Sequence, residues 1–186
     1  MANIGDYEKT CASFDWQTPE RFNFGRDVVD RWAEEGRPAM VWLGTGGEER
    51  RLSFADFARL SDRFAAAARE LGVRKGDRVM VLTGKIPEWH AILTALLKLG
   101  AVAIPCAPQL RARDLEYRAN HSGAVMLVSD GEGLEESEKM RSSAPNLRHF
   151  VSVGAERDGW EPFEGLVEGA PDGFSAEDTA SSDNAF

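Results

Sequence analysis

Residues 78–105 read RVMVLTGKIPEWHAILTALLKLGAVAIP and contain a short apolar run, a longer apolar segment that opens with proline, and a second short apolar run. The short runs, at about 78–83 and 101–105, are predicted to be buried strands. Pro87 suits the first turn of a helix, and the segment from Pro87 to Gly100 is apolar on most faces, so this helix must be covered on both sides. A strand, a helix and a strand in this order predict a parallel pair with a right-handed crossover.

The same alternation continues toward the C-terminus. We expect a helix over about 111–120, a strand over 124–129, a helix over 134–141 and a strand over 149–153. Strands that alternate with helices form a mostly parallel sheet with helices on both faces. The fold class is therefore predicted to be α/β, with a doubly wound sheet.

The residues before this unit predict an N-terminal helix and a hairpin. In residues 20–35 the apolar side chains recur at helical spacing and Gly36 suits the C-cap; these side chains are Phe24, Val28, Val29 and Trp32. GTGG then separates two short alternating runs, PAMVWL and ERRLSF, which is typical of a hairpin. Ser53 is a suitable N-cap for a helix over 54–71.

The charge divides the chain into two parts. The whole chain has 31 acidic and 22 basic residues, and residues 1–130 contain 18 of each, so the last 56 residues hold 13 acids and 4 bases. We expect residues 1–153 to form the α/β unit and residues 154–186, with one short helix near 160–167, to be an acidic surface excursion and linker. Binding to nucleic acid requires a basic face, and neither part supplies one.

Several other classes of protein are disfavoured. Cys11 and Cys106 are far apart and have no ligand-type spacing, so neither a disulfide scaffold nor a metal site is expected. The first ten residues do not resemble a signal peptide, which favours a cytoplasmic location. The most apolar stretch, 89–107, is too often interrupted by polar residues for a membrane span.

Ligands of open parallel sheets bind beyond the carboxyl ends of the strands. Three such ends are TGK at 83–85, CAPQ at 106–109 and SDG at 129–131. Gln109, Arg111 and Arg113 cluster where a helix begins, a place that disfavours cations unless an anion is bound. The alternative is that the two arginines are solvated or pair with nearby acids on the same helix.

The remaining candidates have weaker support. Lys85 precedes the helix that starts at Pro87, so it is either an anion contact or a turn lysine. The three histidines have no serine or cysteine partner at a triad spacing. The acids between Glu132 and Glu138 form a run, which is typical of a solvated helix face.

Three segments together resemble the N-terminal part of AMP-forming acyl-CoA synthetases, which belong to the adenylate-forming ligase superfamily. They are PERFNFGRDVVDRW, LSFADFARLSDRFAAAARELGVRKGDRVMVL and IPEWHAILTALLKLGAVAIPCAPQLRARDLEYRANHSGAVMLVSD. FNFGRDVVD, PEWH and the PQL loop are most similar to the medium-chain branch. The resemblance covers most of the chain.

The resemblance implies a two-step reaction with ATP, coenzyme A and Mg²⁺. A carboxylate, medium-chain or aromatic, attacks the α-phosphate of ATP to give an acyl-adenylate and pyrophosphate, and the thiol of coenzyme A then displaces AMP. The resemblance also implies that Gln109 contacts coenzyme A, with Arg111 and Arg113 adding charge. Lys85 stands where medium-chain relatives often have arginine.

The family's ATP-binding loop, YTSGTTGxPKG, is absent from these 186 residues. The resemblance therefore implies an N-terminal fragment of such a ligase that is inactive alone and that binds neither ATP, coenzyme A nor Mg²⁺ tightly. A rival interpretation is a stand-alone, catalytically inactive α/β binding domain derived from one. The acid substrate and the oligomeric state do not follow from the sequence.

Overall fold

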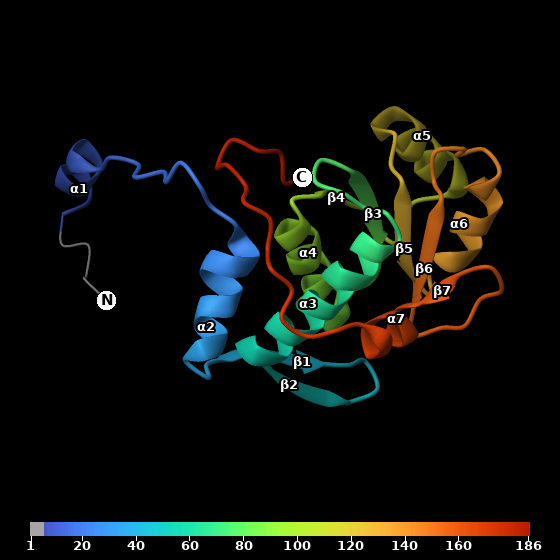
Figure 1. Cartoon of the computed structure of the whole chain (residues 1–186), viewed down its shortest axis with the longest axis horizontal. Helices are drawn as coiled ribbons and strands as arrows, with labels where there is room; N and C mark the ends of the chain where they lie inside the picture. Colours follow the sequence, from blue (N-terminus) through green and yellow to red (C-terminus); the bar gives the residue numbers. More distant parts are fainter. Residues whose placement is uncertain (1–5) are drawn as a thin grey trace.

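The computed structural model describes residues 6–186 and contains one five-stranded parallel sheet and one separate hairpin (Figure 1). The sheet has the order β4-β3-β5-β6-β7, and its strands are β3 (Arg78–Leu82), β4 (Val102–Pro105), β5 (Met126–Asp130), β6 (His149–Val153) and β7 (Glu161–Pro162). The helices that connect them are α4 (Pro87–Leu99), α5 (Ala112–Ser122) and α6 (Leu134–Arg141). All four expected crossover strands are present, which confirms the predicted alternation.

The order of the strands creates a switch point between β3 and β5. From β3 the chain passes through α4 to β4 on one side, and then through α5 to β5 on the other side of β3. The connections leave the neighbouring strands β3 and β5 in opposite directions, so a crevice opens at their carboxyl ends. This edge of the sheet is where the candidate site lies.

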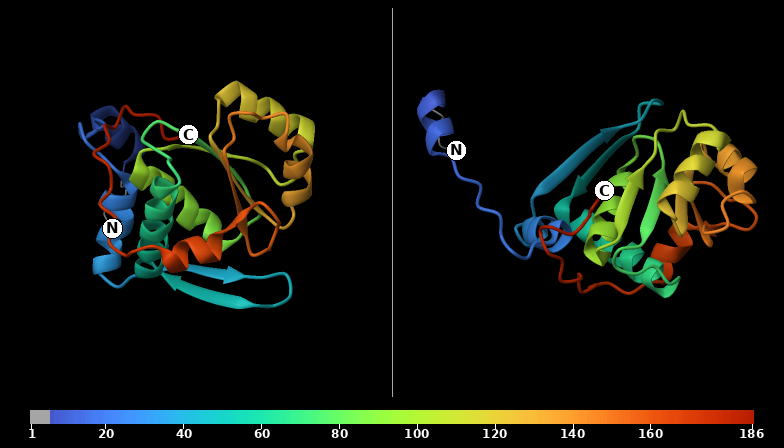
Figure 2. Two further views of the ribbon diagram at one scale, coloured as in Figure 1. Left: turned by 45° about the vertical axis from the view of Figure 1, so that its right-hand side comes forward. Right: turned by 90° about the horizontal axis from the view of Figure 1, so that it is seen from above.

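Helices cover both faces of the sheet (Figure 2). On one face α3 (Phe54–Glu70), α4 and α7 (Phe163–Gly169) share a core that includes Phe64, Leu96 and Phe163. On the other face α5 and α6 pack on a second core around Leu115 and Met140. The doubly wound α/β architecture is therefore confirmed.

The N-terminal helix begins later than expected and starts with a wide turn. It consists of a π-helical segment, η1 (Gly25–Asp30), followed by α2 (Arg31–Glu34), and Gly36 has a positive φ as expected for its C-cap role. The extra residue in a π turn shifts the side chains around the axis. Val29 is accordingly buried, whereas Phe24, which was expected on the same apolar face, is 44% exposed.

The hairpin and the following helix match the sequence closely. Strands β1 (Pro38–Leu43) and β2 (Glu49–Ser53) pair antiparallel around the glycine-rich turn. Ser53 caps α3, with its side chain accepting from the Asp56 amide while the Asp56 carboxylate accepts from the Ser53 amide. This capping box lowers the pKa of Asp56.

The structure corrects the view of residues 154–186 as an excursion that leaves the sheet. β7 pairs with β6 and extends the sheet, and the apolar side chains of Trp160, Phe163 and Phe174 are buried. Beyond α7 the chain returns along the body, where the Glu177 amide donates to the Lys98 carbonyl oxygen at 2.7 Å. The physical reason is that the few aromatic residues of this acidic segment complete the two cores.

The acidic residues of this segment are also held by the body. Arg63 pairs with Asp172 at 2.6 Å, and Lys75 pairs with Asp183 at 2.7 Å. Part of the charge surplus is therefore compensated within the molecule.

Outside this body, α1 (Tyr7–Ser13) projects away at the N-terminal end and has no buried residue (Figures 1 and 2). Among residues 6–186, no helix is both long enough and apolar enough to cross a membrane.

Candidate functional site

A pocket of about 880 Å³ lies at the carboxyl ends of the strands, beneath the hairpin. The loop after β3, the loop after β4, the start of α4, one residue after β5 and part of β1 contribute to it. Its walls are mainly apolar, with a few polar side chains; they are formed by Met40, Val41, Trp42, Thr83, Gly84, Lys85, Ile86, Trp89, His90, Pro105, Cys106, Ala107, Pro108, Gln109 and Glu132. Such a composition is typical of small-molecule sites.

The loop after β3 is fixed from two sides. The Gly84 amide donates to Asp130 Oδ2 at 2.6 Å, which ties this loop to the end of β5. Trp42 Nε1 donates to the carbonyl oxygen of Lys85 at 2.7 Å, which ties the loop to the hairpin. Because α4 begins directly afterwards at Pro87, the backbone around Lys85 has little freedom.

The structure brings two of the four predicted site residues together. Lys85 and Gln109 both line the pocket, from the loops after β3 and β4, and both side chains are exposed to it. Their common position follows from the parallel sheet, which places the carboxyl ends of neighbouring strands at one edge.

The other two predicted residues lie outside the pocket. The Arg111 side chain is 78% exposed and its Nη1 lies 3.8 Å from Glu136 Oε1 on α6, rather than near an acid of its own helix. Arg113 lies in a separate depression with Tyr117 and His121 along α5. Gln109 is therefore the one member of the expected Gln109, Arg111 and Arg113 group that lines this pocket.

The acidic run on α6 is less solvated than expected. Glu136 accepts from the Ala112 amide at 2.8 Å and pairs with Lys139, and Glu138 accepts from Trp160 Nε1 and pairs with Arg141. These bonds, to Lys139 and to Trp160 respectively, lower the pKa of both carboxyl groups. The run therefore connects α6 to α5 and to the C-terminal segment, while Glu132 remains exposed beside the pocket.

Cys106 lines the pocket, but its environment does not favour the nucleophilic thiolate. Burial raises the pKa of its thiol to about 11, so the thiol is protonated at neutral pH. His90, whose ring lies edge-on to Trp89 at 4.8 Å, has a pKa lowered by burial. Within residues 6–186 no three His, Cys, Asp or Glu side chains gather in a way that could hold a metal ion.

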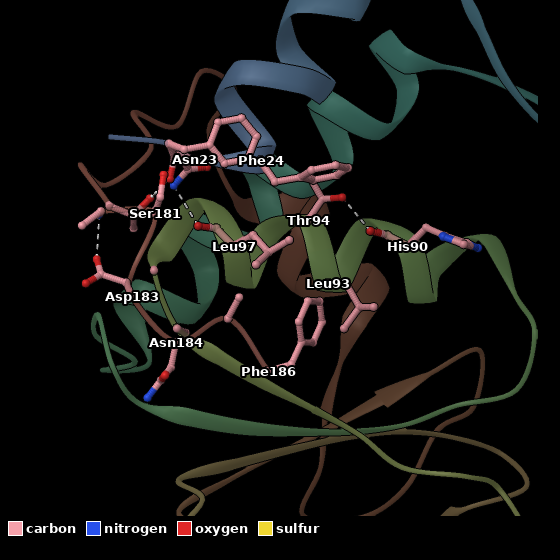
Figure 3. A pocket seen from close by; sticks show the side chains of 16 residues that line it. Asn23, Phe24, His90, Leu93, Thr94, Leu97, Ser181, Asp183, Asn184 and Phe186 are labelled. Carbon is pink, nitrogen blue, oxygen red and sulfur yellow. Dashed lines mark hydrogen bonds between the residues drawn. The ribbon is translucent and has the colours of Figure 1, made fainter. Parts of the chain in front are cut away.

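A second cavity, of about 360 Å³, lies between α4, the N-terminal segment and the C-terminal residues (Figure 3). Most of its polar side chains are already bonded to the protein. Asn23 Nδ2 donates to the Leu97 carbonyl oxygen at 2.8 Å, and Thr94 Oγ1 donates to the His90 carbonyl oxygen at 2.8 Å. Leu93 and Phe186 contribute apolar walls. This cavity therefore offers little to orient a ligand.

Sequence reasoning identified the strand ends that carry Thr83 and Asp130 but gave these residues no role. It also missed Trp42, whose link to Lys85 spans 43 positions of the chain. The signal for Thr83 and Asp130 was their place at the carboxyl ends of buried strands, where Thr83 directly follows β3 and Asp130 is the last residue of β5. No local signal marked Trp42.

Comparison with known proteins agrees with this architecture. Residues 29–185 match the family of AMP-binding enzymes. The chain is 33% identical over 186 residues to acyl-coenzyme A synthetase ACSM3, mitochondrial, of Mus musculus, covering 95% of this chain and 32% of that protein. It is also 33% identical over 172 residues to acyl-coenzyme A synthetase ACSM4, mitochondrial, of Rattus norvegicus, covering 88% of this chain and 30% of that protein.

Two solved structures share the fold. The anthranilate CoA ligase AuaEII, in complex with anthranoyl-AMP, has a TM-score of 0.80 and 25% identity over 89% of this chain and 31% of its own. The Brucella canis acyl-CoA synthetase has a TM-score of 0.84 over 95% of this chain and 34% of its own, with 20% identity. The chain thus spans about a third of the length of the relatives that it matches. Since the family match covers most of the chain and the fold agrees with it, the protein belongs to the family of AMP-binding enzymes.

Proposed function

We propose that this chain is the N-terminal portion of an AMP-forming acyl-CoA synthetase and that its pocket receives part of coenzyme A. The complete enzyme would join a carboxylate to the α-phosphate of ATP, releasing pyrophosphate, and the thiol sulfur of coenzyme A would then attack the acyl carbon and release AMP. The joint position of Lys85 and Gln109 on one pocket carries this proposal. The family match over residues 29–185 supports it.

The chemistry of the pocket suits the uncharged, amide-containing arm of coenzyme A better than it suits the triphosphate of ATP. The Gln109 side-chain amide both donates and accepts hydrogen bonds, so it can bind a polar group of either kind. Lys85 supplies one positive charge, and the exposed Glu132 beside it supplies one negative charge. A triphosphate with Mg²⁺ requires several donors and cations, which these wall residues do not provide. The residues in hand therefore do not fit ATP or Mg²⁺, and we assign both to parts of the enzyme outside this chain.

Arg111 and Arg113 are proposed to act only at longer range. Both are exposed cations at the start of α5, Arg111 as its N-cap and Arg113 in its first turn, so they contribute positive potential near the pocket without lining it. The preferred acid, medium-chain or aromatic, remains a proposal that rests on the resemblance. The cytoplasmic location likewise remains a prediction, and the two curated relatives named above are mitochondrial by name.

Titration calorimetry with coenzyme A and with ATP tests the proposal. We expect saturable binding of coenzyme A by the chain, no comparable binding of ATP, and no ATP–pyrophosphate exchange. In Gln109→Ala, the loss of one hydrogen bond should weaken coenzyme A by about 0.5–1.5 kcal/mol. Gln17→Ala, which alters another exposed glutamine far from the pocket, is the matched control and should change nothing. Equal loss in both variants, or tighter binding of ATP than of coenzyme A, would contradict the proposal.

A further inference from the structure

Three buried side-chain atoms have no hydrogen-bond partner among the residues that the structure describes. They are Thr83 Oγ1, Asp130 Oδ1 and Ser152 Oγ. All three lie at the carboxyl ends of neighbouring strands, β3, β5 and β6. Buried polar groups are almost always bonded, so each of these atoms calls for an explanation.

Two of the three atoms lie at the switch point. The register of β3 and β5 pairs Leu82 with Ser129, which places Thr83 and Asp130 side by side one position further along. Thr83 is only 4% exposed, and it lines the pocket that contains Lys85 and Gln109. Unpaired polar groups therefore gather where an open sheet of this strand order binds its ligands.

The Asp130 carboxylate is already fixed in orientation. Its Oδ2 accepts the Gly84 amide at 2.6 Å, so the carboxylate plane is held against the loop after β3 while Oδ1 remains available. An ionised carboxylate only accepts hydrogen bonds, whereas a threonine hydroxyl both donates and accepts. The pair thus requires at least one incoming N–H or O–H donor.

The surrounding charges restrict what that donor belongs to. Asp130, together with Glu132 on the pocket wall, would repel an anionic group, whereas Lys85, on the loop that Asp130 holds, would repel a cation. A neutral donor, such as an amide or an alcohol, satisfies both conditions.

We propose that Thr83, on the pocket wall, and Asp130, which holds the neighbouring Gly84 amide, form a hydrogen-bonding subsite that receives an N–H or O–H donor of a neutral ligand group. The subsite stands on the geometry alone. Only the identity of the molecule that brings the donor rests on the proposed function, since coenzyme A carries amide N–H groups in its uncharged arm.

Ser152 provides the matched control. Its hydroxyl is unpaired and buried like that of Thr83, but it lies two strands away beside a different depression that contains Arg157 and Trp160. A general effect of removing a buried hydroxyl would appear equally in Ser152→Ala and Thr83→Val. A ligand contact would appear in Thr83→Val alone.

The experiment compares two small amides by ¹⁵N-¹H NMR of the 186-residue chain. N-methylacetamide has an N–H donor, and N,N-dimethylacetamide has the same carbonyl group without it. We expect N-methylacetamide to shift the Gly84 amide signal, which reports on Asp130, and N,N-dimethylacetamide to bind there about fivefold more weakly or worse. Thr83→Val and Asp130→Asn should abolish this difference, and Ser152→Ala should retain it. Asparagine can still accept from the Gly84 amide, so Asp130→Asn alters mainly the free acceptor.

The outcomes separate this inference from the proposed function. Equal responses of wild-type Gly84 to the two amides would overturn the subsite, even if coenzyme A binds, and would leave the unpaired atoms to ordered water alone. A selective response to N-methylacetamide without coenzyme A binding would support the subsite and refute the proposed function. Because the wild-type comparison alone decides the matter, poor folding of a variant does not obscure the result.

Discussion

Buried polar groups are fully hydrogen-bonded near one end of helix α4 and lack partners near the other end. At its C-terminal end Lys98 is completely buried, and its Nζ donates to Asp30 Oδ1 at 2.6 Å, to Asp62 Oδ1 at 2.5 Å and to the Ala58 carbonyl oxygen at 3.4 Å. Beyond its N-terminal end, Thr83 and Asp130 each keep a buried atom without a partner. Full pairing gives Lys98 a structural role, whereas the two unpaired atoms at the switch point are the basis of the proposed ligand subsite.

The Lys98 cluster also explains a glycine. Gly25 lies so close to the Lys98 side chain that a Cβ atom there would clash with Lys98 Cγ. η1 therefore packs directly on the lysine stem, and its Asp30 reaches the ammonium group. The cluster joins η1, α3 and α4 into one unit.

Replacing Lys98 by methionine tests the Lys98 cluster at the C-terminal end of α4 and should have the largest effect on the free energy of unfolding. The substitution keeps the apolar stem but leaves the carboxylates of Asp30 and Asp62 partly buried without their cation. We expect the free energy of unfolding to fall by about 3–5 kcal/mol in urea denaturation. Lys85→Met, at the exposed lysine of the pocket, is the control and should change it by less than about 0.5 kcal/mol. Similar small losses in both variants would contradict the assigned difference.

The loss in Lys98→Met should depend on pH. Burial raises the pKa of Asp30 in the folded protein, and Lys98 partly opposes this shift, so the variant should have a still higher pKa at Asp30. A carboxyl group whose pKa is raised by folding binds protons preferentially in the folded state, and it stabilises that state as the pH falls through the raised pKa. The deficit should therefore be smaller at about pH 5 than at about pH 7.5. A deficit that grows on acidification would show that Asp30 is not the stranded group.

Thr83→Val tests the region before the N-terminal end of α4 and should have the smallest effect on the free energy of unfolding. Since the Thr83 hydroxyl has no partner, its removal breaks no hydrogen bond, and the free energy of unfolding should change by less than about 0.5 kcal/mol or rise slightly. Thr94→Val is the matched control, because Thr94 is similarly buried and its hydroxyl donates to the His90 carbonyl oxygen. That variant should lose about 0.5–1.5 kcal/mol. A larger loss at Thr83 than at Thr94 would refute the contrast.

The local elements could be predicted from the sequence because their signals are local. The boundaries of α6 and β6 agree with the prediction to the residue, and those of α3 do so to within one. For α3 the signals are the Ser53 cap and an apolar face at helical spacing. The pocket was partly predictable, since a parallel sheet brings the ends of its strands, and with them Lys85 and Gln109, to one edge.

The remaining features depend on partners that are distant in sequence. In the sequence, Lys98 is one of the polar residues that interrupt the apolar stretch 89–107. Its partners Asp30 and Asp62 precede it by 68 and 36 positions, so no local pattern shows that it is buried and paired. The short strand β7 joins the sheet through β6 and buried aromatic side chains rather than through a pattern of its own. Whether Arg111 and Arg113 line the pocket depends on the residue at which α5 begins, and composition does not predict that residue.

Chemical-shift mapping of coenzyme A on the ¹⁵N-labelled chain tests the contrast between the two ends most directly. We expect saturable shifts centred on Gly84, Lys85 and Gln109, and none on Gly25, Asp30 or Lys98. Shifts centred on the Lys98 cluster, or no saturable shift at the pocket, would contradict this contrast.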